Sequence, residues 1–485
     1  MASARNPRLS TRPRALIIAY DFPPHAAIGT MRTLRLVREL DSAGWRITVI
    51  TGSPHTYLPG TPIDATLEEQ VPIGVRLLRV RAYRPIAMLQ RLVSGIRPGS
   101  RRRNRTSRSA LPGSDARAVP KHRGSLGTLA HLRDIVDTAA EIPDKESGWI
   151  TPAVVRGIFD ALTHGRPDVI YSTAPPWSGQ VIALALARIS GIPWMADFRD
   201  PWARAPWRDW RRPFRQRAAA VLERSVIQRA DRVAFVTRAN LAEFTAFYGT
   251  TAAERLQLIP NGCDPSEFDG CVSPVTRDAF VLLHAGALYG ARTPVPLLRA
   301  VSAAAGRGDI ARRGFRVRFL GHVSPEIDLE GECRRLGILD LVEIIPRVTR
   351  AESLREMKAA SALLLIQTGT TVSVPGKTYE YLAAGRPILA LTEDGETADL
   401  VRASGIGVVV RPHDSTAIME SALLEAIALA SREVIPPPQE LYDGWTHART
   451  AAHALWQLAR PDQPAMQVHP AVAEPQGVYR EDSVQ

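Results

Sequence analysis

Short apolar runs alternate with longer stretches of helical spacing along most of the chain, and this alternation restricts the fold more than any other feature. Ala15–Tyr20 (ALIIAY) is predicted to be a buried strand, the stretch from about Met31 to Ala43 a helix, and Arg46–Thr51 (RITVIT) the next strand. A strand, a helix and a strand in this order form a parallel unit. Further strands of the first half are expected at Val75–Ala82, Asp168–Thr173, Pro193–Arg199, Arg232–Thr237 and Leu256–Pro260.

The same alternation begins again after Asp264–Arg277, a stretch rich in Pro, Ser, Gly and Asp. We therefore expect an α/β protein of two Rossmann-like, doubly wound domains that face a central cleft. The strands of the second half are predicted at residues 280–285, 316–320, 341–345, 362–367, 388–391 and 408–410. The predicted parts are a flexible N-terminus (1–14), a first domain (15–270), a second domain (271–440), a helix that packs back on the first domain (441–460) and a disordered tail (461–485).

Residues 84–147 interrupt the alternation of the first half, and we interpret them as a partly disordered, basic insertion. Five arginines lie between Arg101 and Arg108. Such a cluster could bind anionic lipid head groups, at about 1 kcal/mol for each arginine near the surface. Trp202, Trp207 and Trp210 lie among further arginines and are also candidates for a membrane interface. The alternative is a solvated loop beside a tryptophan-lined cleft.

Composition narrows the class of protein. Lys and Arg exceed Asp and Glu by 61 to 49, a net charge of +12 that permits an anionic partner such as a phosphate, a membrane surface or a nucleic acid. No nucleic-acid recognition motif is present, so we expect no nucleic-acid partner. The three cysteines lack metal spacing, and no apolar run reaches the roughly 18 residues of a spanning helix. We expect a cytoplasmic protein with at most peripheral membrane contact.

Ligands of parallel sheets bind beyond the carboxyl ends of the strands, where helix amino ends favour phosphates. Gly286, Tyr289 and Arg292 follow the first strand of the second half. A glycine there lets the backbone approach a phosphate closely, and Arg292 could neutralise it through a forked hydrogen bond. The alternative is an ordinary strand–helix turn with a solvated arginine.

A second group of polar residues lies between Ser373 and Pro387. A Pro-Gly turn ending at Gly376 opens a helix that carries Lys377 in its first turn, and Glu380 falls on the same helix face. A cation is unfavourable at a helix amino end unless an anion binds there, and a diphosphate is such an anion. Glu380 could accept hydrogen bonds from ribose hydroxyls. The alternative is a surface Lys–Glu pair.

These residues resemble a known family. The run KTYEYLAAGRPILAL, residues 377–391, resembles the donor-binding signature of retaining GT-B glycosyltransferases of the family 4 type. ALIIAYDFPPHAAIG (15–29) resembles their first strand and acceptor-side loop, and LIPNGCD (258–264) resembles their interdomain segment. ADFRDPW (196–202) resembles a motif of the subset that builds bacterial surface polysaccharides. The resemblance covers roughly residues 15–80 and 165–435.

The resemblance implies a GT-B fold and transfer of a sugar, with retention of configuration, from a nucleotide sugar to a glycan or polyprenyl-linked acceptor. It also implies that no metal or other cofactor is required. By motif position, Lys377 and Arg292 would hold the diphosphate and Glu380 the ribose. Ser373 and the backbone around Gly376 would contact the sugar, and Gly286 and Tyr289 belong to the same donor-binding loop as Arg292. On the acceptor side the implied residues are Gly29, Asp197, Arg199 and Asp200, with the two aspartates orienting the acceptor. His25 in the first loop is a further candidate, with a solvated loop histidine as the alternative.

The sequence also departs from the family pattern. The first of two glutamates usually separated by seven residues is replaced here by Val372. This replacement keeps a catalytically inactive GT-B scaffold open as an alternative. An epimerase acting on nucleotide sugars shares the two-domain plan and is a second alternative, and the basic composition leaves a nucleic-acid-binding protein as a third.

Overall fold

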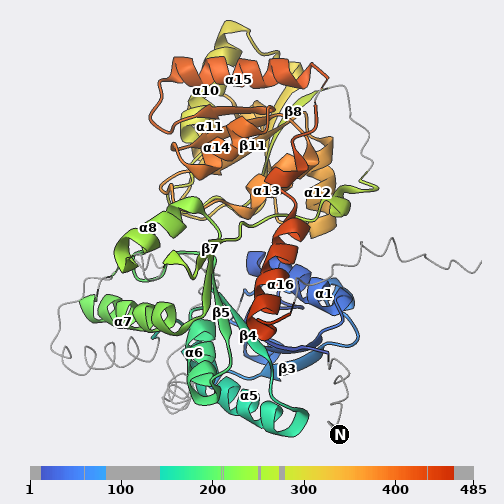
Figure 1. Cartoon of the computed structure of the whole chain (residues 1–485). Coiled ribbons are helices and arrows are strands. Elements are labelled where there is room, and N and C mark those ends of the chain that lie inside the picture. Colours follow the sequence, from blue (N-terminus) through green and yellow to red (C-terminus); the bar gives the residue numbers. More distant parts are fainter. Residues whose placement is uncertain are drawn as a thin grey trace, which may run out of the picture.

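The computed structural model describes residues 12–58, 60–83, 142–208, 210, 212–249, 253–271, 279–433 and 435–463. These residues form two α/β domains, one above the other in Figure 1, each built on one parallel sheet with helices on both faces. The two-domain, Rossmann-like architecture predicted from the alternating pattern is therefore confirmed. Most of the predicted N-terminus (1–14), insertion (84–147) and tail (461–485) lies outside the described residues, which leave out 1–11, 84–141 and 464–485.

The first domain contains a seven-stranded sheet with the order β3-β2-β1-β4-β5-β6-β7. The order in which strands are added to the sheet reverses between β1 and β4, and this position is the switch point of a doubly wound sheet. The strands are β1 (Arg14–Ile18), β2 (Arg46–Gly52), β3 (Arg76–Val80), β4 (Val169–Ala174), β5 (Trp194–Phe198), β6 (Arg232–Phe235) and β7 (Leu256–Leu258). The helices are α1 (Ile28–Ser42), α2 (Thr66–Glu69), α5 (Ile150–His164), α6 (Ser178–Ser190), α7 (Pro213–Arg229) and α8 (Arg238–Tyr248).

The second domain repeats this plan with a six-stranded sheet of order β10-β9-β8-β11-β12-β13, whose switch point lies between β8 and β11. Its strands are β8 (Phe280–Ala285), β9 (Phe315–Leu320), β10 (Val342–Ile345), β11 (Ala362–Gln367), β12 (Ile388–Thr392) and β13 (Gly407–Val410). Its helices are α10 (Val295–Arg307), α11 (Leu329–Arg335), α12 (Arg350–Ala359), α13 (Gly376–Ala384), α14 (Glu396–Ala403) and α15 (Thr416–Ala430).

Burial on both faces explains why the strands have continuous apolar runs. Every residue of β4, β5, β11 and β12 is buried, and each sheet has an apolar cluster on either side. Strands covered on both faces need no alternation of polar and apolar residues.

The chain crosses between the domains twice. The first crossing is a linker, residues 259–271, which contains a short 3₁₀ helix, Pro265–Phe268. The second leads into α16 (Gly444–Ala459), which lies beside α1 in Figure 1. Ala451, Ala452 and Leu455 of α16 join the apolar cluster that α1 covers. Helix α16, the last one that the structure describes, therefore packs on the first domain.

The structure corrects the end of the predicted insertion. Residues 142–149 are part of the first domain, because the buried Asp144 accepts hydrogen bonds from the backbone N–H and the hydroxyl of Ser178 at the start of α6. Helix α5 follows directly and was not predicted. Among the described helices, none combines the length and the apolar character needed to cross a membrane.

Candidate functional site

The loops that follow the strands of one sheet meet those that follow the strands of the other. The Thr237 hydroxyl, after β6, donates to the Val372 carbonyl, after β11, at 2.9 Å. The Arg238 N–H donates to a carboxylate oxygen of Glu396 at 2.7 Å. The carboxyl ends of both sheets therefore face each other, and ligands of doubly wound sheets bind at such ends.

Helix α13 presents a positive end without an acidic partner in its first turn. Its N-cap is Pro375, which has no side chain able to accept a backbone hydrogen bond, and Lys377 lies one residue after the helix start. The helix dipole and the ammonium group have the same sign, so this end favours an anion.

Lys377 and Glu380 lie on one helix face, as the spacing predicts. Lys377 Nζ is 2.7 Å from Glu380 Oε2, and the Glu380 side chain is only 12% exposed. Burial raises the pKa of Glu380, but the charges of Lys377 and Arg350 and their hydrogen bonds outweigh it and lower the pKa to about 2. Glu380 is therefore a fixed, ionised acceptor and not half of a freely solvated surface pair.

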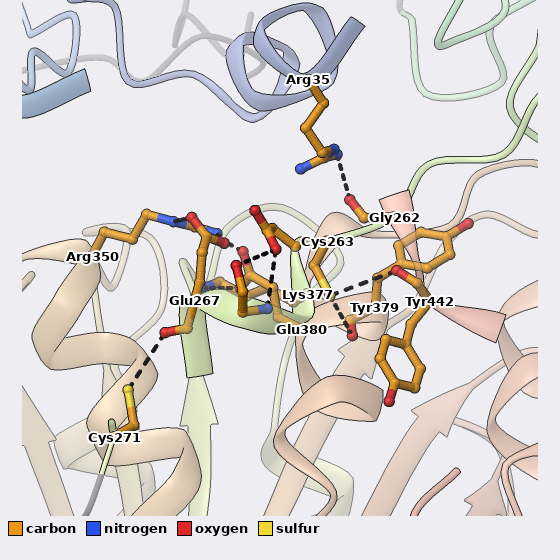
Figure 2. Close-up of polar contacts among 12 residues, drawn as sticks. Arg35, Gly262, Cys263, Glu267, Cys271, Arg350, Lys377, Tyr379, Glu380 and Tyr442 are labelled. Atoms are coloured by element: carbon orange, nitrogen blue, oxygen red, sulfur yellow. Dashed lines mark hydrogen bonds and ion pairs between the residues drawn. The ribbon is translucent and has the colours of Figure 1, made fainter. Parts of the chain in front are cut away.

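The sequence prediction missed Arg350 and Glu267. Arg350, at the start of α12, donates from Nη1 to Glu380 Oε1 at 2.9 Å and from Nε and Nη2 to the two oxygens of Glu267, at 3.0 and 2.5 Å. Figure 2 shows this row of alternating charges beside the linker. A capping box at Thr349 and Glu352 marks the start of α12 in the sequence, but no local signal reports the contacts of Arg350.

The loop after β8 brings the predicted Gly286, Tyr289 and Arg292 to the same edge of the sheet. The Arg292 guanidinium lies over the Tyr289 ring, 4.8 Å from its centroid. Gly286 donates its N–H to the Leu320 carbonyl, and a Cβ at Gly286 would lie 3.2 Å from His284 Nε2.

His284 lies within electrostatic reach of two cations, Arg292 and Lys377. Its Nδ1 lies 2.9 Å from the Leu364 carbonyl, which can only accept, so Nδ1 carries the proton. Burial, partly opposed by that hydrogen bond, and the charges of Arg292 and Lys377 lower the pKa of His284 to about 4. His284 is thus neutral near pH 7, and the positive charges of Arg292 and Lys377 both contribute to its lowered pKa.

Ser373 and Gly376 come shortly before Lys377 in the chain. The Ser373 hydroxyl accepts a hydrogen bond from Gln367 Nε2 at 3.2 Å, and Gly376 is the first residue of α13. Both residues are half-buried. All seven donor-side residues nominated by the sequence therefore follow β8 or β11, on either side of the second switch point.

On the first-domain side, Asp21 brings together two predicted residues. Its Oδ1 lies 3.0 Å from His25 Nδ1, and its Oδ2 accepts from Arg199 Nη2 at 3.0 Å. Burial opposes ionisation of Asp21, yet the hydrogen bond from His25 and the charge of Arg199 leave its pKa below the usual value. An ideal Cβ on Gly29 would lie 1.0 Å from Arg199 Nη1, so Gly29 provides the room for this guanidinium.

Asp200 connects the two domains electrostatically. It is half-buried, and burial raises its pKa above the usual value although the charges of Arg199 and Arg292 act in the opposite direction. Asp200 comes from the loop after β5 and Arg292 from the loop after β8, so a first-domain carboxyl group lies within electrostatic reach of the second-domain cation.

The prediction that Asp197 lines the cleft and orients the acceptor is wrong. Asp197 is completely buried inside β5, where Oδ2 accepts from Arg32 Nε, Tyr171 and Thr173 and Oδ1 accepts from Arg32 Nη2. Arg32 continues to the backbone carbonyls of Ile259 and Pro260. Asp197 therefore fastens α1 and the start of the linker to the sheet.

Trp202 is a second correction, because it is fully buried and stacked on Trp177 with ring centroids 4.7 Å apart. It cannot lie at a membrane interface, whereas Trp207 is about half exposed. Among the described residues, no group of three His, Cys, Asp or Glu side chains is arranged to hold a metal ion.

Comparisons with known proteins agree with this geometry. Residues 29–262 match the model of the glycosyl transferase 4-like domain family. The sequence matches none of the curated proteins. Anabaena HepE in complex with UDP and glucose is similar in structure, with 15% identity, 92% of this chain and 99% of that chain covered, and a TM-score of 0.54.

Two further solved structures resemble the chain. A glycosyltransferase from Rickettsia africae shares 10% identity, covers 93% of this chain and 99% of its own, and gives a TM-score of 0.55. The N-terminal domain of trehalose-6-phosphate phosphatase from Candida albicans shares 12%, covers 94% and 98%, and gives 0.58. Together these likenesses show that the chain has the two-domain GT-B fold and that its first half is similar to a glycosyl transferase 4-like domain.

Proposed function

We propose that this chain is a glycosyltransferase that moves a sugar from a nucleotide sugar to a glycan or polyprenyl-linked acceptor, in the synthesis of a cell-surface polysaccharide or glycolipid. One observation carries the proposal: Lys377, in the first turn of α13, is paired with the ionised Glu380, and Arg292, from the loop after β8, acts together with Lys377 on the same buried His284. A nucleoside diphosphate has the matching groups, two phosphates for the cations and ribose hydroxyls for the carboxylate. The family match and the UDP and glucose held by Anabaena HepE support this ligand class.

In the proposed reaction, the bond between the sugar C1 and the diphosphate oxygen breaks while the acceptor oxygen bonds to C1. Negative charge grows on the leaving diphosphate. Lys377, Arg292 and the helix end are already in place around it, and such preorganised charges are a main source of rate enhancement. These basic groups would take the place that a metal ion has in other enzymes, so the proposal includes no metal or other cofactor.

The acceptor side of the proposal uses Asp200 and His25. Asp200 lies within electrostatic reach of Arg292, and Asp21 holds the His25 ring in one orientation. Both side chains can orient an acceptor hydroxyl. Retention of configuration is proposed from the resemblance of residues 377–391 to retaining enzymes, with the acceptor proton passing to the leaving phosphate. A peripheral position at the cytoplasmic face of an anionic membrane is proposed from the arginine cluster 101–108 and the polyprenyl-linked acceptor class.

A thermal-shift and calorimetry panel of UDP-, GDP-, ADP- and dTDP-sugars tests the proposal. At least one should stabilise the wild type, and Lys377→Ala and Arg292→Ala should each lower its affinity at least tenfold. Arg313→Ala, an exposed residue of the second domain, removes the same charge and should leave the affinity unchanged. If no nucleotide sugar binds the wild type, the proposal is refuted.

Product analysis by NMR with the binding donor then separates the enzyme classes. Transfer to an added acceptor with an unchanged anomeric configuration supports a retaining transferase. Conversion of the donor sugar without any acceptor would identify an epimerase, and binding without turnover an inactive scaffold.

A further inference from the structure

We infer that Arg350 is a positioning residue that fixes Glu380 for ribose recognition and ties that contact to the interdomain linker. The inference rests on the proposed function, because it assumes that a nucleoside diphosphate occupies the amino end of α13. It concerns two residues, Arg350 and Glu267, that no sequence motif assigns to the site.

The two oxygens of Glu380 have different partners. Oε2 is paired with Lys377 and Oε1 with Arg350. A diphosphate would draw Lys377 toward itself, which frees Oε2 for a ribose hydroxyl. Arg350 is then the remaining cation among the described residues within ion-pair distance of Glu380. It would keep the buried carboxylate ionised and hold Oε1 still while Oε2 accepts from the ribose.

Glu267 in turn fixes Arg350. Both Glu267 oxygens accept from the Arg350 guanidinium, which leaves Nη1 directed at Glu380. The planar guanidinium can serve two carboxylates in a fixed geometry, whereas a lysine ammonium is a point charge on a flexible stem. The arrangement therefore depends on arginine itself and not only on a positive charge.

The position of Glu267 connects this contact to the rest of the molecule. Glu267 belongs to the 3₁₀ helix of the linker, which the Asp264 side chain caps. A few residues earlier, the Gly262 carbonyl accepts from Arg35 Nη2 of α1 at 2.7 Å, and Cys263 Sγ lies 3.3 Å from the Tyr379 carbonyl of α13 (Figure 2). The linker thus contacts the first domain through Gly262 and is connected to Glu380 through Glu267 and Arg350.

The test compares UDP, GDP and ADP with their 2′,3′-dideoxy forms by isothermal titration calorimetry. The readout is the ratio of the two dissociation constants for the nucleotide that binds best, because this ratio isolates the contact with the ribose hydroxyls. The wild type should prefer the ribose form at least tenfold, as expected for a hydrogen bond to a charged acceptor. Glu380→Gln should bring the ratio close to one.

Arg350→Met should reduce the ratio to about threefold or less, and Arg350→Lys should restore it only in part. Glu267→Gln should lower it moderately and provides a second route if Arg350→Met folds poorly. Arg355→Met, an exposed position on the same helix, is the matched control and should keep the wild-type ratio.

The possible outcomes are distinct. A variant at Arg350 that binds both forms more weakly but keeps the wild-type ratio would overturn the inference and leave the proposed function intact. A wild-type ratio near one would also overturn it, because Glu380 would then not read the ribose. Absence of any nucleoside diphosphate binding by the wild type would refute the proposed function and the inference together.

Discussion

Replacing Asp197 with alanine should lower the free energy of unfolding of the first domain without altering the donor site in the second. The substitution removes the acceptor of four hydrogen bonds and leaves the Arg32 guanidinium buried and uncompensated, since the Asp197 side chain is 0% and that of Arg32 only 11% exposed. Removing one partner of a buried ion pair costs about 3–5 kcal/mol. We expect a loss of that size in the free energy of unfolding of the first domain.

Tryptophan fluorescence in urea is a suitable assay, because all nine tryptophans belong to the first domain or to α16 and its start. Asp399→Asn on the second domain, where the side chain is 73% exposed, should change the free energy of unfolding by less than about 0.5 kcal/mol. The double variant Arg32→Ala with Asp197→Ala should lose less than the sum of the single losses, since neither charge is then left alone.

The pH dependence gives a further check on Asp197. Burial raises its pKa, but Arg32, Tyr171 and Thr173 more than compensate, so the folded-state pKa is below the usual value. The stabilisation is therefore complete above the unfolded pKa, about 3.9, and disappears as the pH falls through the lower folded value. A variant that keeps wild-type stability near pH 7 but loses transfer activity would refute the structural role and return Asp197 to the chemistry.

Three further predictions concern the site. Gly29→Ala should displace the Arg199 guanidinium and lower turnover at least tenfold, as steady-state kinetics would show. The control is Gly306→Ala in α10, where an added Cβ would have nothing within 4 Å; it should stabilise the helix by up to about 1 kcal/mol, as melting curves would show. The pKa of His284 is about 4 in the folded state, so between pH 4 and 6.5 this histidine is mostly protonated only in the unfolded state, and the free energy of unfolding should rise with pH. His284→Gln should flatten this slope, measured by urea titrations followed by circular dichroism. The pKa of Glu380, about 2, predicts that the stability difference between wild type and Glu380→Gln is complete above about pH 4.3 and shrinks as the pH falls toward 2, which the same titrations measure.

The fold could be predicted from the sequence because its strands are buried on both faces. The apolar runs at 280–285 and 362–367 have the bounds of β8 and β11. Helix α5 was missed because it comes just after the predicted insertion, residues 84–147, so its apolar spacing was not separated from that interruption of the alternation. Helix α1 begins at Ile28, before the predicted Met31. This start was missed because Ala27 supplies no side-chain cap that would mark it in the sequence.

The site could be predicted only where its residues are close in sequence. Lys377 and Glu380 are three residues apart, and helical spacing alone placed them on one face. Arg350 is 30 residues from Glu380 and 83 from Glu267, so their contact depends on how α12, α13 and the linker pack. Asp197 was misjudged because it was grouped with its sequence neighbours. The later residues of ADFRDPW lie at the strand end, but Asp197 lies inside the sheet, paired in register with Thr173 of β4 and Ala234 of β6.

The departure at Val372 affects the sugar side of the proposed site more than the nucleotide side. Val372 contacts the first domain through its carbonyl, which accepts from Thr237, and Thr237 also caps α8 through Asn240. Any side chain at position 372 can provide that backbone contact. The ion pairs of Lys377, Glu380 and Arg350 do not involve Val372. Nucleotide binding should therefore survive a change at position 372, so that Val372→Glu alters the preferred sugar and leaves the affinity for the nucleoside diphosphate within about threefold, as calorimetry with the free diphosphate would show.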